Sequence, residues 1–197
     1  MLANAVLRAL RHIWKSLEPA GVPMAVMGGI GLAAWECFRA TKDVDLLVGV
    51  EAAEQAAALK RMTDAGIRPK RQPPVLTIGE TRIIQLQYEP PDTFIDVQID
   101  LLLAESEYHR MALSRRIPAG LPGLDTEIFV LSCEDLILFK LIAGRIIDRV
   151  DSAALVRENR ATIDCGYLLR WSDALSLTAD LREIWAEAFP GESLPSG

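Results

Sequence analysis

Two aspartates, Asp43 and Asp45, are separated by one residue in a segment rich in Val and Leu. Because successive side chains of a β-strand point to opposite faces, a strand here places both carboxylates side by side. Val44 and Leu46 then point into the core. Adjacent carboxylates repel each other unless a cation neutralises them. Hard oxygen ligands suit Mg²⁺, which prefers one or two carboxylates together with substrate phosphates. The spacing therefore predicts a site for a divalent cation.

A third carboxylate is expected from the strand predicted over residues 93–103. Asp96 and Asp100 share the face of this strand that is opposite to its apolar residues. Asp100 lies deeper in the apolar run, where an acid is costly unless it has a partner, so we favour Asp100 and keep Asp96 as the alternative. Three carboxylates on two adjacent strands would hold two ions in the arrangement used for phosphoryl and nucleotidyl transfer.

The glycine pair Gly28-Gly29 follows a short apolar segment, 23–27, that we predict to be a buried strand. A strand, a flexible turn and then a helix present free backbone N–H groups, which suit a phosphate. Without side chains, the turn also lets a triphosphate approach the backbone closely. The pair is therefore expected to lie against the phosphates of a nucleotide, although any tight turn can use two glycines.

Helices and strands alternate around these residues. The pattern predicts helices over 3–17, 30–38 and 51–65 and strands over 23–27, 43–48, 81–88 and 93–103. This order favours an α+β (α/β-like) fold, with a mixed β-sheet flanked by helices. After residues 118–123 the pattern becomes helical, over about 134–156 and 173–189. We divide the chain into an α/β core, 1–125, and a helical C-terminal part, 126–197, packed on that core.

Composition excludes several classes of protein. Lys and Arg number 21 against 27 Asp and Glu, a net charge of −6, which argues against a general electrostatic grip on nucleic acid. Three isolated cysteines and two histidines do not predict a zinc site or a disulfide framework. Charged residues interrupt the N-terminal apolar stretch and the longest later one, so neither an export signal nor a membrane span is predicted. We expect a cytoplasmic protein without a membrane partner.

The glycine pair and the aspartates together resemble a known signature. An apolar residue and Gly-Gly, thirteen intervening residues and Asp-Val-Asp-Leu are similar to the pattern of the nucleotidyltransferase (polymerase-beta-like) superfamily. The spacing of Arg39, Thr41, Asp43 and Asp45 is similar to that of stand-alone bacterial nucleotidyltransferases of the AbiEii toxin type. A later segment resembles their helical motif K-x4-R-x-x-D, with Lys140 in its first position.

The resemblance implies an enzyme of the nucleotidyltransferase fold that uses an NTP and Mg²⁺ or Mn²⁺. It implies that the metal ligands and catalytic residues are Asp43, Asp45 and Asp100. The residues expected to bind the nucleotide are Gly28, Gly29, Arg39, Thr41, Lys140 and Asp148, with Asp151 near the last two. One position departs from the family pattern, because Ile30 stands where toxin-type members often have Ser or Thr.

Structural interpretations remain open for several of these residues. The strand aspartates would be solvated surface groups, Lys140 would extend from a core helix or pair with Asp148 and Asp151, and Arg39 would pair with Asp43 or Glu36. The predicted function is metal-dependent transfer of an NMP from an NTP to an acceptor hydroxyl of RNA, protein or a small molecule. Family resemblance adds a role as the toxin of a toxin–antitoxin pair. The alternative is an inactive nucleotidyltransferase-like module that binds a protein such as an antitoxin.

Overall fold

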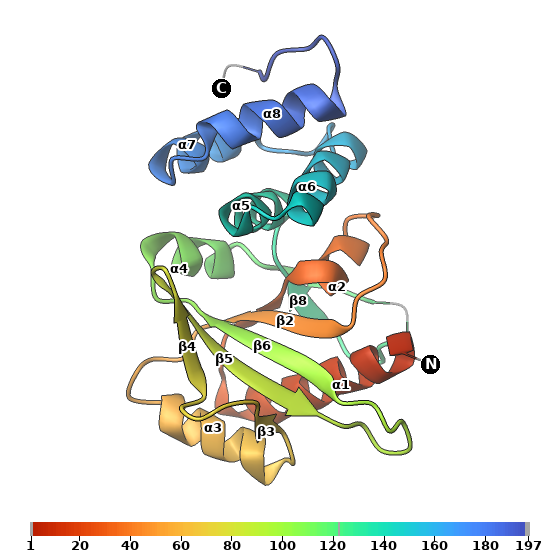
Figure 1. The fold of residues 1–197 in the computed structure, drawn as a ribbon, viewed down its shortest axis with the longest axis vertical. Helices are drawn as coiled ribbons and strands as arrows, with labels where there is room; N and C mark the ends of the chain where they lie inside the picture. Colours follow the sequence, from red (N-terminus) through yellow and green to blue (C-terminus); the bar gives the residue numbers. More distant parts are fainter. Residues whose placement is uncertain (1, 122, 196–197) are drawn as a thin grey trace.

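A computed structural model describes residues 2–121 and 123–195, and its centre is a mixed sheet (Figure 1). The strands are β1 Met24–Val26, β2 Asp43–Val48, β3 Arg68–Pro69, β4 Val75–Ile78, β5 Thr81–Tyr88, β6 Val97–Leu103, β7 Ile117–Ala119 and β8 Ile128–Val130. Their order is β3-β5-β6-β2-β1-β8-β7, with β4 paired to β5. β2 is parallel to β6 and antiparallel to β1. The predicted mixed sheet flanked by helices is confirmed.

Alternation along the strands divides the core into two layers. Val44, Leu46 and Val48 of β2 point to one face, where α1 (Leu2–Leu17) and α3 (Gln55–Asp64) cover the sheet. Leu47 points to the other face and packs with residues of α2 (Gly28–Ala33), α4 (Glu107–Ser114) and α5 (Cys133–Ala143). Asp43 and Asp45 therefore project toward the face that α2 and α5 cover.

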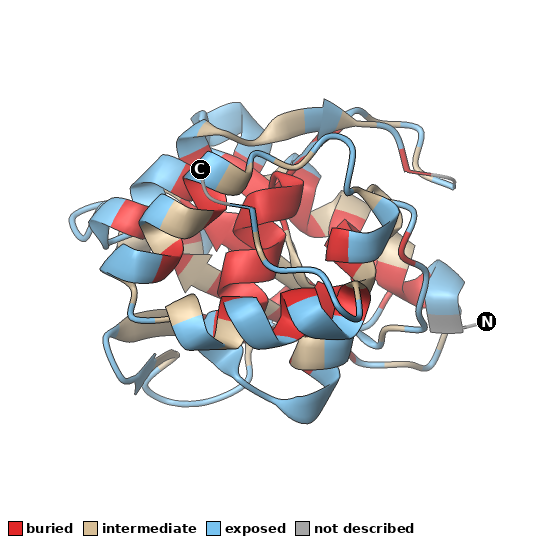
Figure 2. Cartoon of the chain, turned by 90° about the horizontal axis from the view of Figure 1, so that it is seen from above, coloured by how far each residue is buried: buried red, intermediate tan, exposed pale blue. Residues whose placement is uncertain are grey.

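The C-terminal helices form a further layer above α5. They are α6 (Ile146–Glu158), α7 (Cys165–Ala174) and α8 (Thr178–Ala188). Buried residues gather at the centre of the molecule and exposed ones line its outside (Figure 2). α5 is buried along nearly its whole length, because the sheet side and α6 enclose it. Within the described ranges, no helix has the length and apolar character that crossing a bilayer requires.

The structure corrects several predicted boundaries. The single helix expected over 134–156 is two helices, because Gly144 adopts a left-handed conformation (φ 65°) and ends α5. The helix expected over 30–38 begins earlier, at Gly28, and ends at Ala33. The strand expected over 93–103 begins at Val97, after a loop in which Asp92 and Phe94 have positive φ.

Four short strands, β3, β4, β7 and β8, were not predicted. β7 and β8 form a hairpin-like pair, and β8 also joins the sheet beside β1, in parallel. β8 lies after residue 125, so the sheet includes a strand from the C-terminal part of the chain. β7 and β8 have only three residues each, too few for an alternating pattern to distinguish them from a loop. This extra edge connects directly to α5, whose N-terminus is capped by Ser132.

Candidate active site

The aspartates of β2 lie beside Asp100 of β6. In the parallel pairing of the two strands, Asp45 is opposite Asp100 and Asp43 is opposite Gln98. Neighbouring strands are about 4.8 Å apart, so the side chains of opposite residues on one face are adjacent. Asp96 lies before the strand, on the surface, where Arg68 Nη2 is 2.8 Å from its Oδ1. The structure thus places Asp43, Asp45 and Asp100 on neighbouring strands, with Asp45 directly opposite Asp100, and leaves Asp96 outside.

These carboxylates carry like charges in a partly buried place. Burial raises the pKa of Asp45 to about 6, and the charges of Asp100 and Asp43 add to this effect. The pKa of Asp100 is also raised, chiefly by burial, although hydrogen bonds from Gln98 (2.8 Å) and Gln85 (3.4 Å) oppose the shift. The cluster therefore favours anything that brings positive charge to it.

Gly28 forms the opposite wall of this cluster. Its φ is +59°, and a Cβ atom at this position would lie 1.9 Å from Oδ2 of Asp45. A Cβ on Gly29 would lie 2.7 Å from Cβ of Thr41. Only glycine fits either position without displacing its neighbour. The glycine pair therefore lies directly against the predicted site residues, with its backbone free to approach a ligand.

A second group of charges lies on the helical side of the site. The buried Lys140 Nζ of α5 is 2.6 Å from Asp151 Oδ2 and 3.3 Å from Asp148 Oδ1, both on α6. Arg145 binds Asp148 at 2.5 and 3.2 Å, and Arg39 Nε is 3.0 Å from Asp151. Burial alone would raise the pKa of Asp148, but Arg145 and Lys140 outweigh it, so the net shift is downward. Three cations thus balance two carboxylates.

This network shows which side chains pair with Lys140 and with Arg39, two residues for which the sequence left alternatives open. Lys140 pairs with both Asp148 and Asp151, and because α5 and α6 are separate helices, the network connects helices instead of stiffening one. Arg39 pairs with Asp151, and not with Asp43 or Glu36, the partners considered as the alternative to phosphate contact. Sequence spacing placed Lys140 and Asp151 on one face of a continuous helix, which the break at Gly144 removes.

A small polar cavity of about 110 Å³ connects the two groups of charges. It is lined by most of the predicted nucleotide-binding residues and by one aspartate of β2; those members are Gly28, Gly29, Arg39, Asp45, Lys140 and Asp148. Arg145 also lines it and was not among the predicted nucleotide-binding residues. The signal was present, because Arg145 occupies the arginine position of the K-x4-R-x-x-D motif.

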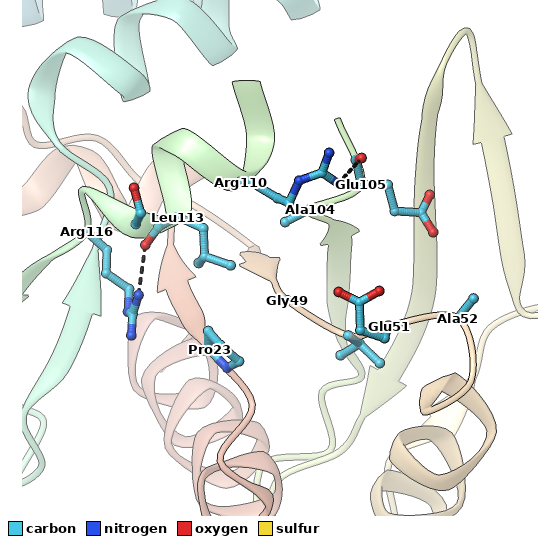
Figure 3. A pocket seen from close by; sticks show the side chains of 11 residues that line it. Pro23, Gly49, Glu51, Ala52, Ala104, Glu105, Arg110, Leu113 and Arg116 are labelled. Carbon is cyan, nitrogen blue, oxygen red and sulfur yellow. Dashed lines mark hydrogen bonds between the residues drawn. The ribbon is translucent and has the colours of Figure 1, made fainter. Parts of the chain in front are cut away.

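A larger cavity lies elsewhere and holds none of the predicted residues. It measures about 520 Å³ and opens near the carboxyl ends of β2 and β6, around Gly49 and Ala104 (Figure 3). Arg110 donates to the carbonyl of Glu105, and Arg116 to that of Leu113. The cavity volume alone is therefore a poor guide to the chemistry of this protein.

The donor set fits a hard divalent cation. Over residues 2–121 and 123–195, no three His, Cys, Asp or Glu side chains converge closely enough to hold a metal by themselves. Mg²⁺ needs only one or two carboxylates when substrate phosphates complete its shell. Asp45 and Asp100 offer such a pair on adjacent strands, and burial with the charges of Asp100 and Asp43 raises the pKa of Asp45.

The fold and this site are typical of a nucleotidyltransferase, and the comparison with a known protein family gives the same class. The chain belongs to the family described as the nucleotidyl transferase AbiEii toxin of the type IV toxin–antitoxin systems, whose model matches residues 8–193. The protein is thus a nucleotidyltransferase enzyme, and its substrate class includes an NTP. No curated sequence matches it significantly.

Solved structures share the fold at low sequence identity. An antigenic nucleotidyltransferase-like protein from Paracoccidioides brasiliensis is 15% identical, with 93% of this chain and 96% of that chain covered and a TM-score of 0.50. ANT(2″)-Ia in complex with adenylyl-2″-tobramycin is 14% identical, with 90% and 97% covered and a TM-score of 0.53. A protein from Thermotoga maritima assigned as a nucleotidyltransferase is 17% identical, with 80% and 94% covered and a TM-score of 0.52.

Proposed function

We propose that the protein transfers an NMP from an NTP to an acceptor hydroxyl, with Asp43, Asp45 and Asp100 holding Mg²⁺ or Mn²⁺. The observation that carries this proposal is the set of three carboxylates on two neighbouring strands, where Asp45 lies opposite Asp100. Burial, together with the charges of Asp100 and Asp43, raises the pKa of Asp45 to about 6. A bound divalent ion would supply positive charge there, lower the pKa of the acceptor hydroxyl and stabilise the departing pyrophosphate.

The other residues of the site would bind and orient the nucleotide. The backbone at Gly28 and Gly29 would approach the phosphates, since neither residue carries a side chain that blocks them. Arg145 and Arg39 border the same polar cavity and would contribute positive charge. Lys140 would act mainly through Asp148, because its ammonium group is buried between two carboxylates. Thr41 would position the turn through its packing against Gly29.

The acceptor and the biological role are a separate part of the proposal. The family description names a toxin, and the ANT(2″)-Ia structure contains an adenylylated antibiotic, so RNA, protein and small molecules are all acceptors to test. We propose that the enzyme acts as the toxin of such a pair, with an antitoxin as its partner. We place it in the cytoplasm, where the free Cys37, Cys133 and Cys165 would remain reduced.

We also propose that the two parts of the chain divide the work. Residues 1–125 supply the carboxylates and the glycine turn, and the helical part, 126–197, supplies Lys140, Arg145 and Asp148 from the other side.

The double variant Asp43→Asn, Asp45→Asn tests the proposal. Incubation with each labelled NTP, Mg²⁺ and cell extract should show transfer to an acceptor by the unaltered protein. The double variant should lose about 1000-fold or more of this activity, because about 4 kcal/mol of transition-state stabilisation disappears. Circular dichroism should show an unchanged fold. Wild-type transfer by the double variant would refute the assignment of these residues.

An inactive, protein-binding module is the second candidate function, and one residue favours it. Ile30 follows the glycine pair and is buried in the core (6% exposed), so it offers a phosphate no hydroxyl contact. Calorimetry with each NTP plus Mg²⁺ or Mn²⁺ separates the two functions. Metal-dependent binding supports the enzyme, and its absence supports the module.

A further inference from the structure

A second cavity lies against Asp45 and Asp100, next to the polar cavity. It measures about 420 Å³, within the range of small-molecule sites. Its walls come from the β4–β5 hairpin, β6, α4 and α5. Most of its lining is apolar, including Ile78, Ile83, Leu102, Phe139 and Ile142.

The strand alternation explains why carboxylate and apolar groups meet here. Asp100 and Leu102 point to the same face of β6, and on β5 they are paired with Gln85 and Ile83. Two residues along a strand span about 6.6 Å. A group whose hydroxyl reaches Asp100 would thus extend over the apolar side chains of Leu102 and Ile83.

The position of the two cavities relative to Asp45 suggests their separate roles. The two cavities share the wall formed by Met27, Asp45, Phe139, Ala143 and Arg145. Gly28 and Lys140 line only the polar cavity, and Asp100 lines only the apolar one. In the sheet, the apolar cavity lies over β5 and β6. β2 lies between these strands and β1, which leads into the turn before α2. In-line displacement at phosphorus requires the attacking oxygen to approach opposite the leaving group. With pyrophosphate leaving on the side of Gly28, the attacking hydroxyl comes from the apolar cavity.

The charges in the cavity limit what can occupy it. Among the described residues that line it, the acids are Asp45 and Asp100 and the one side chain with a fixed positive charge is Arg145. Both acids are the residues proposed to hold metal ions, so no further carboxylate is left to neutralise an ammonium group. A polycationic sugar would therefore lose the hydration of its charges without gaining ion pairs.

An aromatic pair forms part of the cavity wall. The rings of His109 and Phe139 are stacked, with centroids 5.3 Å apart and an interplanar angle of 25°. His109 is buried, and burial lowers its pKa, so the imidazole is neutral near pH 7. A neutral ring pair offers a flat, uncharged contact surface.

We propose that this apolar cavity binds the acceptor through an uncharged, mainly apolar moiety that carries the attacking hydroxyl. The inference rests on the proposed nucleotidyl transfer. The hydroxyl oxygen forms a bond to the α-phosphorus while the bond from that phosphorus to the bridging oxygen breaks. Pyrophosphate leaves with the electron pair, and the hydroxyl proton passes to Asp100 or to solvent. The moiety belongs either to a free small molecule or to the end group of a polymer.

Two matched surface variants test the cavity. Ile78→Asp adds a charge to its wall, at a side chain that is 59% exposed and so tolerates polarity. Met111→Asp makes the same change on α4 outside both cavities, at a side chain that is 41% exposed. Ile78→Ser removes apolar surface without adding charge. Each protein is incubated with labelled NTPs, Mg²⁺ and cell extract, with 2-phenylethanol or tobramycin as a competitor, and calorimetry measures binding of Mg²⁺–NTP.

The expected result is a roughly tenfold loss of acceptor labelling in Ile78→Asp and a smaller loss in Ile78→Ser, with Mg²⁺–NTP binding retained. Met111→Asp should label acceptor within about twofold of the unaltered protein. Excess 2-phenylethanol, a neutral aryl alcohol, should inhibit labelling, whereas polycationic tobramycin should not. The labelled product should pass through a cation exchanger, and gel filtration should identify it as a small molecule or a polymer.

Other outcomes overturn the inference in distinguishable ways. Wild-type labelling by Ile78→Asp, or a polycationic product, would refute the assignment of the cavity and leave nucleotidyl transfer intact. Absence of Mg²⁺–NTP binding by the unaltered protein would refute the proposed function, and the cavity assignment with it.

Discussion

Two groups of aspartates meet at one polar cavity, which Asp45 of one group and Asp148 of the other line, and their charges are balanced in different ways. Asp148 and Asp151 of α6 are contacted by Lys140, Arg145 and Arg39. Asp43, Asp45 and Asp100 lie beside one another on β2 and β6, and among the described residues none of the three forms an ion pair. The first group has more cations than carboxylates, and the second has carboxylates alone.

The pKa values express this difference. The cations around Asp148 lower its pKa despite burial, whereas burial and like charge raise that of Asp45 to about 6. The helical group is therefore stabilised by the fold itself. The strand group is destabilised in the free protein and is relieved by a ligand that brings positive charge. The contrast distinguishes aspartates whose charge is neutralised by ion pairs within the fold from aspartates without such ion pairs among the described residues.

Removing Lys140, the cation between Asp148 and Asp151, should have the largest effect on stability. Lys140→Met keeps the length of the side chain but leaves Asp148 and Asp151 buried with one cation fewer. We expect a loss of about 3–5 kcal/mol in the free energy of unfolding, measured by urea denaturation. Lys60→Met, which breaks an exposed pair with Asp64, should cost at most about 0.5 kcal/mol. Equal losses from the two variants would show that the buried network stabilises the protein no more than an exposed ion pair does.

Crowding the strand aspartates at Asp45 should have the next largest effect on stability. Gly28→Ala would place a methyl group 1.9 Å from Asp45 Oδ2, so the carboxylate must move. Gly21→Ala has a similar positive φ (+67° against +59°) but meets no atom within 4 Å, so it measures backbone strain alone. Gly28→Ala should therefore be less stable than Gly21→Ala by about 1–3 kcal/mol in thermal unfolding. Identical stability would mean that Asp45 is not held against the turn.

Neutralising Asp45 should stabilise the protein when no divalent ion is present. Its pKa is about 6 in the folded protein and 3.8 ordinarily, so wild-type stability falls as the pH rises from about 4 through 6. Asp45→Asn should be more stable by about 1–2 kcal/mol at pH 7 and equal to wild type near pH 4, measured in EDTA. Asp148→Asn should show the opposite trend. The pKa of Asp148 is lowered in the folded protein, so the penalty of this substitution is present at pH 7 and shrinks on acidification. Parallel pH profiles for the two variants would contradict the contrast.

The smallest effect is expected at the surface aspartate. Asp96→Asn removes an exposed ion pair with Arg68 and should change the free energy of unfolding by at most about 0.5 kcal/mol. Its NTP-transfer rate should equal that of the unaltered protein, whereas Asp100→Asn should lose most of the activity. Loss of transfer in Asp96→Asn would extend the site beyond the strands.

Much of the site follows from local spacing. The alternation of a strand places Asp43 and Asp45 on one face whatever the tertiary context, and it places Asp96, Gln98 and Asp100 together in the same way. Parity does not distinguish Asp96 from Asp100, because that choice depends on where β6 begins and how it pairs with β2. The register that sets Asp100 opposite Asp45 joins residues 55 positions apart. The sequence alone also favoured Asp100, because an acid deep in an apolar run is costly to bury without a partner.

The network around Lys140 shows the opposite case. Helical periodicity placed Lys140 near Asp151 on one continuous helix, but the left-handed Gly144 divides that helix in two. The same residues still meet, because α6 folds back against α5. Arg39 joins them from 112 residues away, which no local pattern indicates.

The sequence by itself determined which side chains carry negative charge, which turn lacks side chains, and the alternation that exposes one face of each strand. These properties depend on residue type and on repeats of two or a few residues. Only the tertiary structure decided which charges are neutralised, which segments enclose the apolar cavity beside Asp100, and which of two aspartates lies opposite Asp45. Those outcomes depend on pairings between distant segments, and Coulomb energies and desolvation change steeply over the few ångströms that such pairings fix.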